Sequence, residues 1–218
     1  MRLIYDRLLD HFGPRGWWPA ETDWEVVVGA ILTQNVAWRN VVQAIDNLRG
    51  AGLLELERMR QASEEELAVL IVPTRFYQVK ARKLKRFVSY LVENYDGDLY
   101  RLLDQPWAKL RGELLSLWGL GPETVDSILL YAGRHPVFVV DAYTRRIFSR
   151  LRLLPEDAGY QEMQDFFMLH LRGSEEIYNE YHALIDGLGN RVCLSKKPRC
   201  GECPLREMCG EDRNGAGT

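Results

Sequence analysis

All four cysteines of this 218-residue chain lie close together near its C-terminal end, as Cys193, Cys200, Cys203 and Cys209 in the pattern C-x6-C-x2-C-x5-C. A reducing cytoplasm disfavours two crowded disulfides, so the spacing indicates a shared metal site. Four thiolates suit either zinc or a [4Fe-4S] cluster. Zinc sites usually present two close cysteine pairs, and only Cys200 and Cys203 form one here. The spacing therefore favours iron and sulfur, and zinc stays open.

A second group of residues with chemical potential is the stretch LWGLGPET at 117–124. Gly119 and Gly121 allow positive φ angles and leave backbone N–H groups unshielded. The helix that follows adds its own free N–H groups, so the turn could bind one phosphate of a nucleic-acid backbone. Its flanks, GELLSLW and PETVDSILLYA, predict a helix-hairpin-helix at about 113–132. The alternative is a turn that only reverses the chain.

Asp141 is the third candidate, since it follows the apolar run VFVV and begins a predicted helix. It could simply be an N-cap, worth about 1 kcal/mol. A carboxylate near bound DNA could instead stabilise an oxocarbenium-like sugar and help a water molecule to attack it.

The elements that must position these groups are predicted to be helices, and the fold class is all-α. Thr22 with Glu25, and Ser63 with Glu66, have the spacing of capping boxes. A basic amphipathic helix is predicted over 76–95, with an apolar stripe made of Phe76, Val79, Leu84, Phe87, Leu91 and Val92. Only 136–140, PVFVV, has strand-like composition.

Two helical lobes are predicted. One is a six-helix lobe at 20–133 that contains the hairpin; the other combines 1–19 with 134–210 and includes the cysteine loop at 193–209. The tail 211–218 is expected to be disordered.

Composition is that of a globular protein, with 46% apolar residues and a net charge of −3. The N-terminal residues have no long uncharged apolar run, so neither a signal peptide nor a membrane span is expected, and a cytoplasmic location is the default. Two basic stretches, 75–86 and 191–200, contain no acidic residue. Each is either a nucleic-acid contact or a solvated surface.

Taken together, the hairpin LWGLGPET, the downstream VVDAYTRR, the cysteine loop and the segment GAILTQN resemble the endonuclease III (HhH-GPD) superfamily of base-excision DNA glycosylases. The resemblance covers about residues 20–209. It implies a [4Fe-4S] cluster on the four cysteines, a catalytic Asp141, and two helical lobes with DNA bound across the groove between them. The damaged nucleotide would be flipped out into a pocket there.

Position 123 departs from part of that family. Its bifunctional members have a lysine two residues after the second glycine, whose amine forms a Schiff base and allows the strand to be cut. This chain has Glu123, and a carboxylate cannot form that imine. The resemblance therefore implies a monofunctional enzyme that uses water and leaves an abasic site in an intact strand.

A further resemblance, to the bacterial 3-methyladenine glycosylases of this superfamily, rests on GWWPA, LTQNVAW, FYQVKARKLK and the hairpin glutamate. It implies that Trp17 or Trp18, together with Trp38, sandwiches the damaged base, with Glu123 beside it. Because 3-methyladenine is positively charged in DNA, indole faces would attract it by about 0.5–2 kcal/mol. The alternative is that these tryptophans belong to the core.

The expected partner is duplex DNA with a damaged base, bound by a monomeric protein near the nucleoid of a bacterial or archaeal cell. Expected DNA contacts beyond the two hairpin glycines are Gln34, Asn35, Arg145, Lys196, Lys197 and Arg199. The four histidines show no ligand spacing and receive no role. Other interpretations remain: a glycosylase for oxidised pyrimidines or mismatches with lyase activity from another lysine, a non-catalytic DNA-binding module, and a small electron-transfer protein.

Overall fold

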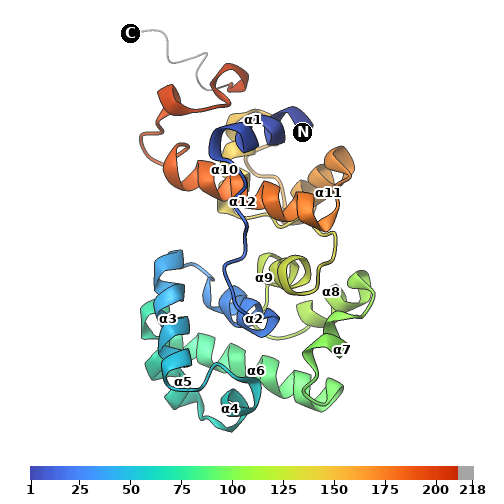
Figure 1. Ribbon diagram of the computed structural model, residues 1–218. Coiled ribbons are helices and arrows are strands. Elements are labelled where there is room, and N and C mark those ends of the chain that lie inside the picture. The colour runs from blue at the N-terminus through green and yellow to red at the C-terminus, as the bar shows by residue number, and fades with distance from the viewer. Residues whose placement is uncertain (211–218) are drawn as a thin grey trace. The chain divides into compact units, whose positions relative to one another are not determined.

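Helices make up all regular structure in the computed structural model, which describes residues 1–210, and no β-strand occurs among them. The all-α prediction is confirmed. The predicted disordered tail, 211–218, lies outside the described residues. None of the described helices is long and apolar enough to cross a bilayer. The chain divides into two units, Ala20–His135 on the one hand and Met1–Pro19 with Pro136 onwards on the other (Figure 1).

The unit Ala20–His135 contains eight α-helices, where six were expected. The extra two are short: α4 and α7 have six and five residues. The helices are α2 (Asp23–Leu32), α3 (Trp38–Gly50), α4 (Leu56–Gln61), α5 (Glu64–Leu70), α6 (Tyr77–Tyr95), α7 (Leu99–Leu103), α8 (Trp107–Leu115) and α9 (Pro122–Ser127). A short 3-10 turn, η1 (Val72–Thr74), precedes α6, and a π-helical segment, η2 (Ile128–Ala132), continues α9.

Side-chain caps begin two of these helices where the sequence predicts them. Ser63 and Glu66 form a reciprocal capping box at α5. Thr22 caps α2, accepting a hydrogen bond of 3.1 Å from the backbone N–H of Glu25. Here the box is not reciprocal, because the Glu25 carboxylate accepts hydrogen bonds from the Arg49 guanidinium and from another backbone N–H.

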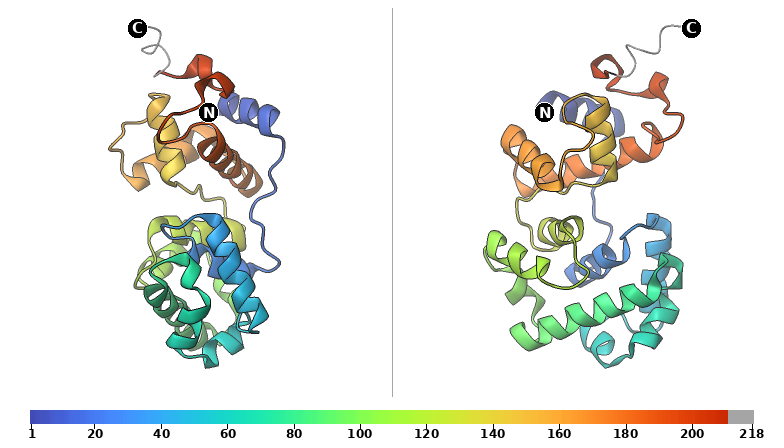
Figure 2. Two further views of the ribbon diagram at one scale, coloured as in Figure 1. Left: turned by 90° about the vertical axis from the view of Figure 1, so that its left-hand side faces the viewer. Right: turned by 180° about the vertical axis from the view of Figure 1, so that it is seen from behind.

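The core of this unit forms around α2, which is buried from Val26 to Leu32. It packs against α3, α6, α9 and η2, and α6 is a long helix running across the unit (Figure 2). In α6 the predicted stripe is buried at Leu84, Phe87 and Leu91. The stripe prediction is wrong at Phe76 and Val79, which are exposed at the start of the helix, where the rest of the unit does not cover them.

The other unit contains α1 (Arg2–Phe12), α10 (Ala142–Arg150), α11 (Tyr160–Leu171) and α12 (Glu175–Arg191). Two single-turn 3-10 segments, η3 (Cys200–Glu202) and η4 (Arg206–Met208), follow in the cysteine loop. Both α1 and α10 pack on α12. The first helix of the chain therefore shares a core with its last α-helix.

An extended segment, not a strand, leads into α10. Residues 137–140 are almost fully buried, and the side-chain amide of Gln164 donates a 2.7 Å hydrogen bond to the carbonyl oxygen of Phe138. The Phe138 ring stacks on Phe167 at 4.0 Å between centroids, and both rings contact Tyr181 edge-on. This packing holds the segment in place and thereby sets where Asp141 begins α10.

Candidate functional site

The hairpin turn joins α8 to α9 and uses its two glycines differently. Gly119 has φ 87°, in the left-handed region that glycine adopts without penalty. Gly121 has φ −94° and is the N-cap of α9, with Pro122 in the first turn. Only Gly119 therefore uses the positive φ that the sequence analysis allowed for both glycines, and a Cβ at Gly121 would meet no atom within 4 Å.

Gln34 connects this hairpin to α6. Its side-chain amide donates to the carbonyl oxygen of Gly119 at 3.2 Å and to the hydroxyl of Thr124 at 2.9 Å. Its side-chain oxygen accepts a hydrogen bond from the Lys83 ammonium. The Lys83 side chain crosses Gly119 so closely that a Cβ there would lie 2.6 Å from Cε of the lysine. Burial lowers the pKa of Lys83. Asn35 is exposed with φ 54°.

A buried lysine ties the turn after α2 to the turn before α6. Lys80 is 2% exposed, and its ammonium donates to the carbonyl oxygens of Leu32 at 2.8 Å and Thr74 at 2.6 Å. Burial, reinforced by the charge of Lys83, lowers the pKa of Lys80 to about 8. The second turn presents Phe76, which has φ 43° and is 69% exposed. The sequence analysis expected Phe76 to be buried in the apolar stripe and did not single out Lys80. The only signal for Lys80 was its place in the basic stretch 75–86, which contains no acidic residue.

Glu123 lies exposed in the first turn of α9. An acidic side chain is favourable there because the N-terminal end of a helix carries partial positive charge. Its backbone carbonyl accepts a 2.7 Å hydrogen bond from the hydroxyl of Ser127.

Asp141 is the N-cap of α10, as expected. One carboxylate oxygen, Oδ1, accepts hydrogen bonds from the backbone N–H and the hydroxyl of Thr144, both at 2.7 Å. The other, Oδ2, lies 3.8 Å from Nε2 of His182 on α12. The cap and a chemical role are therefore compatible, since the cap occupies only Oδ1. His182 has no sequence motif that could have revealed it.

The tryptophans are half-buried rather than part of the core. Trp17 and Trp18 lie side by side with ring centroids 5.5 Å apart and planes at 60°. Trp38 is the first residue of α3, in the unit that also contains Glu123. The tryptophan pair belongs to the unit that contains Asp141.

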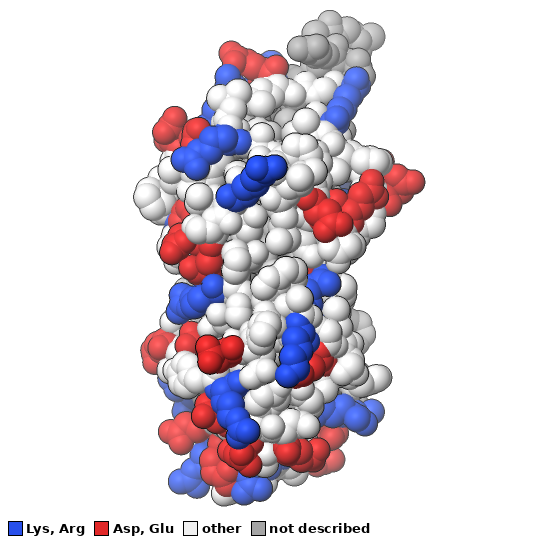
Figure 3. Space-filling model, turned by 90° about the vertical axis from the view of Figure 1, so that its right-hand side faces the viewer, with Lys and Arg blue, Asp and Glu red and all other residues white. Residues whose placement is uncertain are grey.

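The expected basic contacts differ in their surroundings. Lys196, Lys197 and Arg199 are exposed in the loop between the first two cysteines. Arg145 instead donates a hydrogen bond to the carbonyl oxygen of Ala158 within its own unit. Basic and acidic side chains are interspersed on the face drawn in Figure 3, without a large patch of one sign. That face therefore has no broad positive surface.

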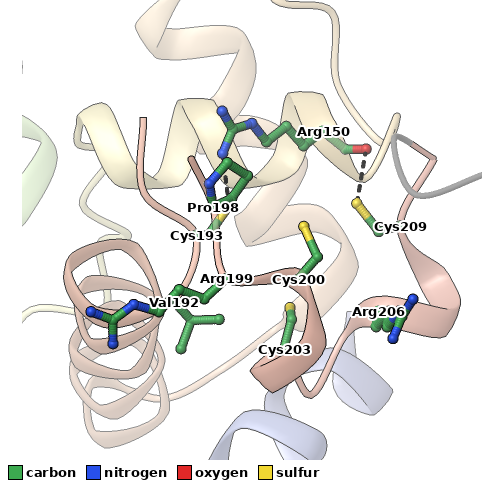
Figure 4. Close-up of a pocket in the computed structure, with 9 residues that line it drawn as sticks. All are labelled: Arg150, Val192, Cys193, Pro198, Arg199, Cys200, Cys203, Arg206 and Cys209. Atoms are coloured by element: carbon green, nitrogen blue, oxygen red, sulfur yellow. Dashed lines mark hydrogen bonds between the residues drawn. The ribbon is translucent and has the colours of Figure 1, made fainter. Parts of the chain in front are cut away.

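The four cysteines line one pocket, together with Arg150, Val192, Pro198, Arg199 and Arg206 (Figure 4). Among the described residues, no three potential ligands converge on the position of a single metal ion. A lone zinc ion would need its four sulfurs about 2.3 Å away. Four thiols spaced around a cavity suit a larger iron-sulfur cluster instead. Burial and the three neighbouring cysteines raise the pKa of the Cys203 thiol, so its thiolate form would depend on bound cationic charge.

Two arginines of α10 hold the cysteine loop. Arg150 donates to the sulfur of Cys193 at 3.3 Å and to the carbonyl oxygens of Leu194 and Ser195 at 2.8 and 3.1 Å. Arg146 donates to the carbonyl oxygen of Cys193 at 2.9 Å. Such donors around ligating sulfurs orient them and tune the metal centre.

Comparison with known proteins places these features in a family. Residues 28–171 match the model of the HhH-GPD superfamily of base excision DNA repair proteins. Residues 193–209 match the iron-sulfur binding domain of endonuclease III. The second match covers all four cysteines and supports a [4Fe-4S] cluster on them.

Individual relatives are similar over most of the chain. MJ1434 of Methanocaldococcus jannaschii, an inferred DNA repair glycosylase, is 49% identical over 207 residues, covering 94% of both chains. The structure of Helicobacter pylori 3-methyladenine DNA glycosylase bound to 1,N6-ethenoadenine has a TM-score of 0.74 and 27% identity, covering 87% of this chain and 94% of that one. A trapped endonuclease III–DNA covalent intermediate has a TM-score of 0.84 at 21% identity, covering 99% and 97%, which shows a shared fold.

Proposed function

The chain belongs to the HhH-GPD superfamily of base excision DNA repair proteins, and on that basis we propose that it is a monofunctional glycosylase that removes alkylated purines such as 3-methyladenine. The observation that carries the proposal is Glu123, an exposed acid in the first turn of α9 at the hairpin position where a lyase needs an amine. That the protein is a DNA glycosylase follows from the family itself.

In the proposed reaction Asp141 acts with water. The bond from C1′ of the deoxyribose to the base breaks, and its electron pair leaves with the base. The carboxylate stabilises the positive charge that develops on the sugar. Oδ1 stays in the helix cap, so Oδ2 serves the reaction without loss of the cap. Water then adds to C1′ and gives up a proton, leaving an abasic site in an uncut strand.

A cationic purine suits this arrangement because its glycosidic bond is already weakened, so no strong general acid is needed. The half-buried indoles of Trp17, Trp18 and Trp38 would attract the charged base, at about 0.5–2 kcal/mol for a cation over an aromatic face. The negative charge of Glu123 fits the same ligand. The Helicobacter pylori relative, by its name, acts on 3-methyladenine.

Contacts with the DNA strand complete the proposal. The N–H groups at Gly121 and the start of α9 would bind a phosphate, and the exposed loop basics would bind others. Asn35 and the exposed Phe76 would enter the duplex around the extruded nucleotide, and Gln34, expected to contact DNA, would instead hold the hairpin through its hydrogen bonds. The [4Fe-4S] cluster would keep the basic loop folded. The protein would act as a monomer in the cytoplasm.

A second candidate is a glycosylase with lyase activity on oxidised pyrimidines or mismatches. Lys83 favours it, because its ammonium hydrogen-bonds to Gln34 within the hairpin network and burial lowers its pKa. A lysine with a lowered pKa in a nucleic-acid site is a potential nucleophile.

Three duplexes distinguish these candidates, carrying 3-methyladenine, thymine glycol or uracil. Free base and strand breaks are measured separately, with and without alkali, for wild type and Asp141→Asn. Asparagine retains the N-cap, so a folding defect is not expected. We expect release of 3-methyladenine, breaks only after alkali, and loss of release in the variant. Breaks without alkali that Lys83→Met abolishes would establish the second candidate, and no release from any duplex would overturn both.

A further inference from the structure

A titratable side chain, His182, lies beside the carboxylate oxygen of Asp141 that is not used in the helix cap. It lies on α12, buried against α10, and its Nε2 is 3.8 Å from Oδ2 of Asp141. The two side chains keep 11% and 13% of their surface exposed. The other oxygen of Asp141 is occupied by the two hydrogen bonds from Thr144. The histidine therefore stands beside the oxygen that the proposed reaction uses.

The separation of 3.8 Å is informative. It exceeds a direct hydrogen bond, which has a length of about 2.7–3.2 Å. One water molecule can hydrogen-bond to both atoms at that spacing, which is the usual arrangement of polar groups that lie somewhat too far apart. A nucleophilic water needs an acceptor that takes its proton and a second group that fixes its position. A carboxylate and an imidazole supply both.

The residues around this pair make it a fixed site. Gly189, on the same helix, leaves room for the Tyr143 ring, since a Cβ there would lie 2.5 Å from that ring. Tyr143 donates to the side-chain oxygen of Asn190, whose amide donates to Asp186 at 2.9 Å. The α12 backbone thus approaches the start of α10 closely, which places His182 against Asp141.

We infer that His182 acts with Asp141 as a catalytic residue that binds and deprotonates the attacking water. This inference rests on the proposed function, because it assumes hydrolysis at C1′. As the water oxygen bonds to C1′, one of its protons passes to Nε2 of His182, and the departing base takes the electron pair of the broken bond. Because the imidazole takes the proton, the Asp141 carboxylate does not have to hold it and also offset the charge on the sugar.

The charged and titratable groups around His182 are consistent with proton uptake. Asp186 lies one helical turn further along α12, and burial raises the pKa of its carboxyl, with smaller effects of His182, Asp141 and Arg15. From α10 the pair is faced by Tyr143, over which Arg146 lies at 5.0 Å. From the N-terminal segment, the Arg15 guanidinium lies against Gly187. Two carboxyl groups thus flank the imidazole on which a proton would be held.

The test uses His182→Gln and His182→Ala in the full-length, cluster-containing protein. Glutamine retains a hydrogen-bonding amide near the position of Nε2 but cannot take up a proton. We expect His182→Gln to lower the single-turnover rate of base release by about 100-fold, as for loss of a general base. The dependence of this rate on pH should also differ between wild type and His182→Gln, because glutamine cannot take up a proton. DNA affinity should not change.

The alanine variant tests the placement of water. In buffer with methanol, the sugar is captured by either water or methanol, and the methyl glycoside fraction is measured. We expect this fraction to rise in His182→Ala, because the bound water is no longer favoured. His170→Gln is the matched control, since this histidine lies exposed on α11 and one of its ring nitrogens is hydrogen-bonded to the carbonyl oxygen of Phe166 in its own helix.

The rates are measured on whichever of the three duplexes releases a free base with the wild type. If the proposed substrate is wrong, a different duplex is then the one that reacts. An unchanged rate and pH profile in His182→Gln would overturn the inference. So would a rate loss accompanied by equal losses of DNA affinity and thermal stability, since that pattern belongs to a structural residue. An unchanged methanol fraction in His182→Ala would show that His182 does not place the water.

Discussion

The two hairpin glycines should respond in opposite ways to the same small change. In Gly119→Ala the new Cβ would lie 2.6 Å from Cε and 2.9 Å from Cδ and Cγ of Lys83, and the backbone has φ 87°. In Gly121→Ala the backbone, at φ −94°, already suits alanine, and no atom lies within 4 Å of the added Cβ. The pair therefore separates a folding role from a binding role within one turn.

The size of each effect follows from these contacts. Left-handed backbone costs a non-glycine residue about 1–2 kcal/mol. Displacing Lys83 also breaks its hydrogen bond to Gln34, worth about 1 kcal/mol. We expect Gly119→Ala to lose about 2–3 kcal/mol of unfolding free energy in total. In Gly121→Ala, alanine is a poorer N-cap than glycine, which lowers the free energy of unfolding. Alanine also reduces the conformational entropy of the unfolded chain, which raises it. These effects nearly cancel, so we expect a net change within about 0.5 kcal/mol.

DNA affinity should show the reverse order: among folded molecules, Gly121→Ala should weaken DNA binding more than Gly119→Ala does. If the N–H of Gly121 binds a phosphate closely, a Cβ there should raise Kd about 10-fold, since a hydrogen bond to a charged group is worth about 1.5–3 kcal/mol. The dependence of Kd on salt should stay the same, because no cation is removed. The measurements are guanidinium unfolding and fluorescence anisotropy with an undamaged duplex at several salt concentrations.

Either of two results would refute this reasoning. A Gly119→Ala protein as stable as the wild type would show that Lys83 does not lie across the turn in solution. A Gly121→Ala protein that binds DNA like the wild type would show that the hairpin backbone does not contact a phosphate. Lys83→Met provides the matched control, because it removes the same hydrogen bond to Gln34 without changing the backbone.

Three further predictions concern other parts of the chain. Arg150→Met removes the donor to the Cys193 sulfur and to the loop carbonyls, so absorbance near ~400 nm should fall faster in the presence of a chelator than in wild type; equal rates would contradict this role. Glu123→Lys places an amine at an exposed position in the first turn of α9. The unfavourable interaction of this cation with the helix dipole should lower the free energy of unfolding by less than about 1 kcal/mol. The amine should form a Schiff base that borohydride traps as a covalent DNA adduct, which wild type does not form. Lys80 has a folded-state pKa of about 8, below its ordinary value of 10.5, so the unfolded chain binds more protons between these values and stability should rise with pH through that window. The difference in unfolding free energy between wild type and Lys80→Met, followed from pH 8 to 10.5, measures this effect, and a flat difference would refute it.

Local signals were sufficient for much of the fold and the site. The caps at Thr22, Ser63 and Asp141 depend on a side chain and a backbone N–H three residues later, so they can be read from spacing. The cysteine loop is equally local, because its ligands lie within one short segment. The hairpin could be recognised because its glycine pair stands between two helical patterns.

Other features depend on how distant segments pack. The exposure of Phe76 was not predictable from helical periodicity. Periodicity predicts which face of a helix is apolar, but it does not predict how far along the helix other elements pack against that face. Lys80 looks like a surface lysine in the sequence, and its burial requires the turns at Leu32 and Thr74 to meet. The different surroundings of the two hairpin glycines likewise depend on Lys83, a residue of α6 whose side chain crosses Gly119 and not Gly121.

The pairing of Asp141 with His182 shows the same distinction most clearly. The sequence was enough to identify a carboxylate at the start of a helix and an acid in place of a lyase lysine, because both are properties of short segments. The histidine came from a different helix, and its position depends on the rotation of α12 against α10 and on the aromatic core beneath them. Helix rotation is set by the packing of many side chains at once, so no single stretch of sequence specifies it.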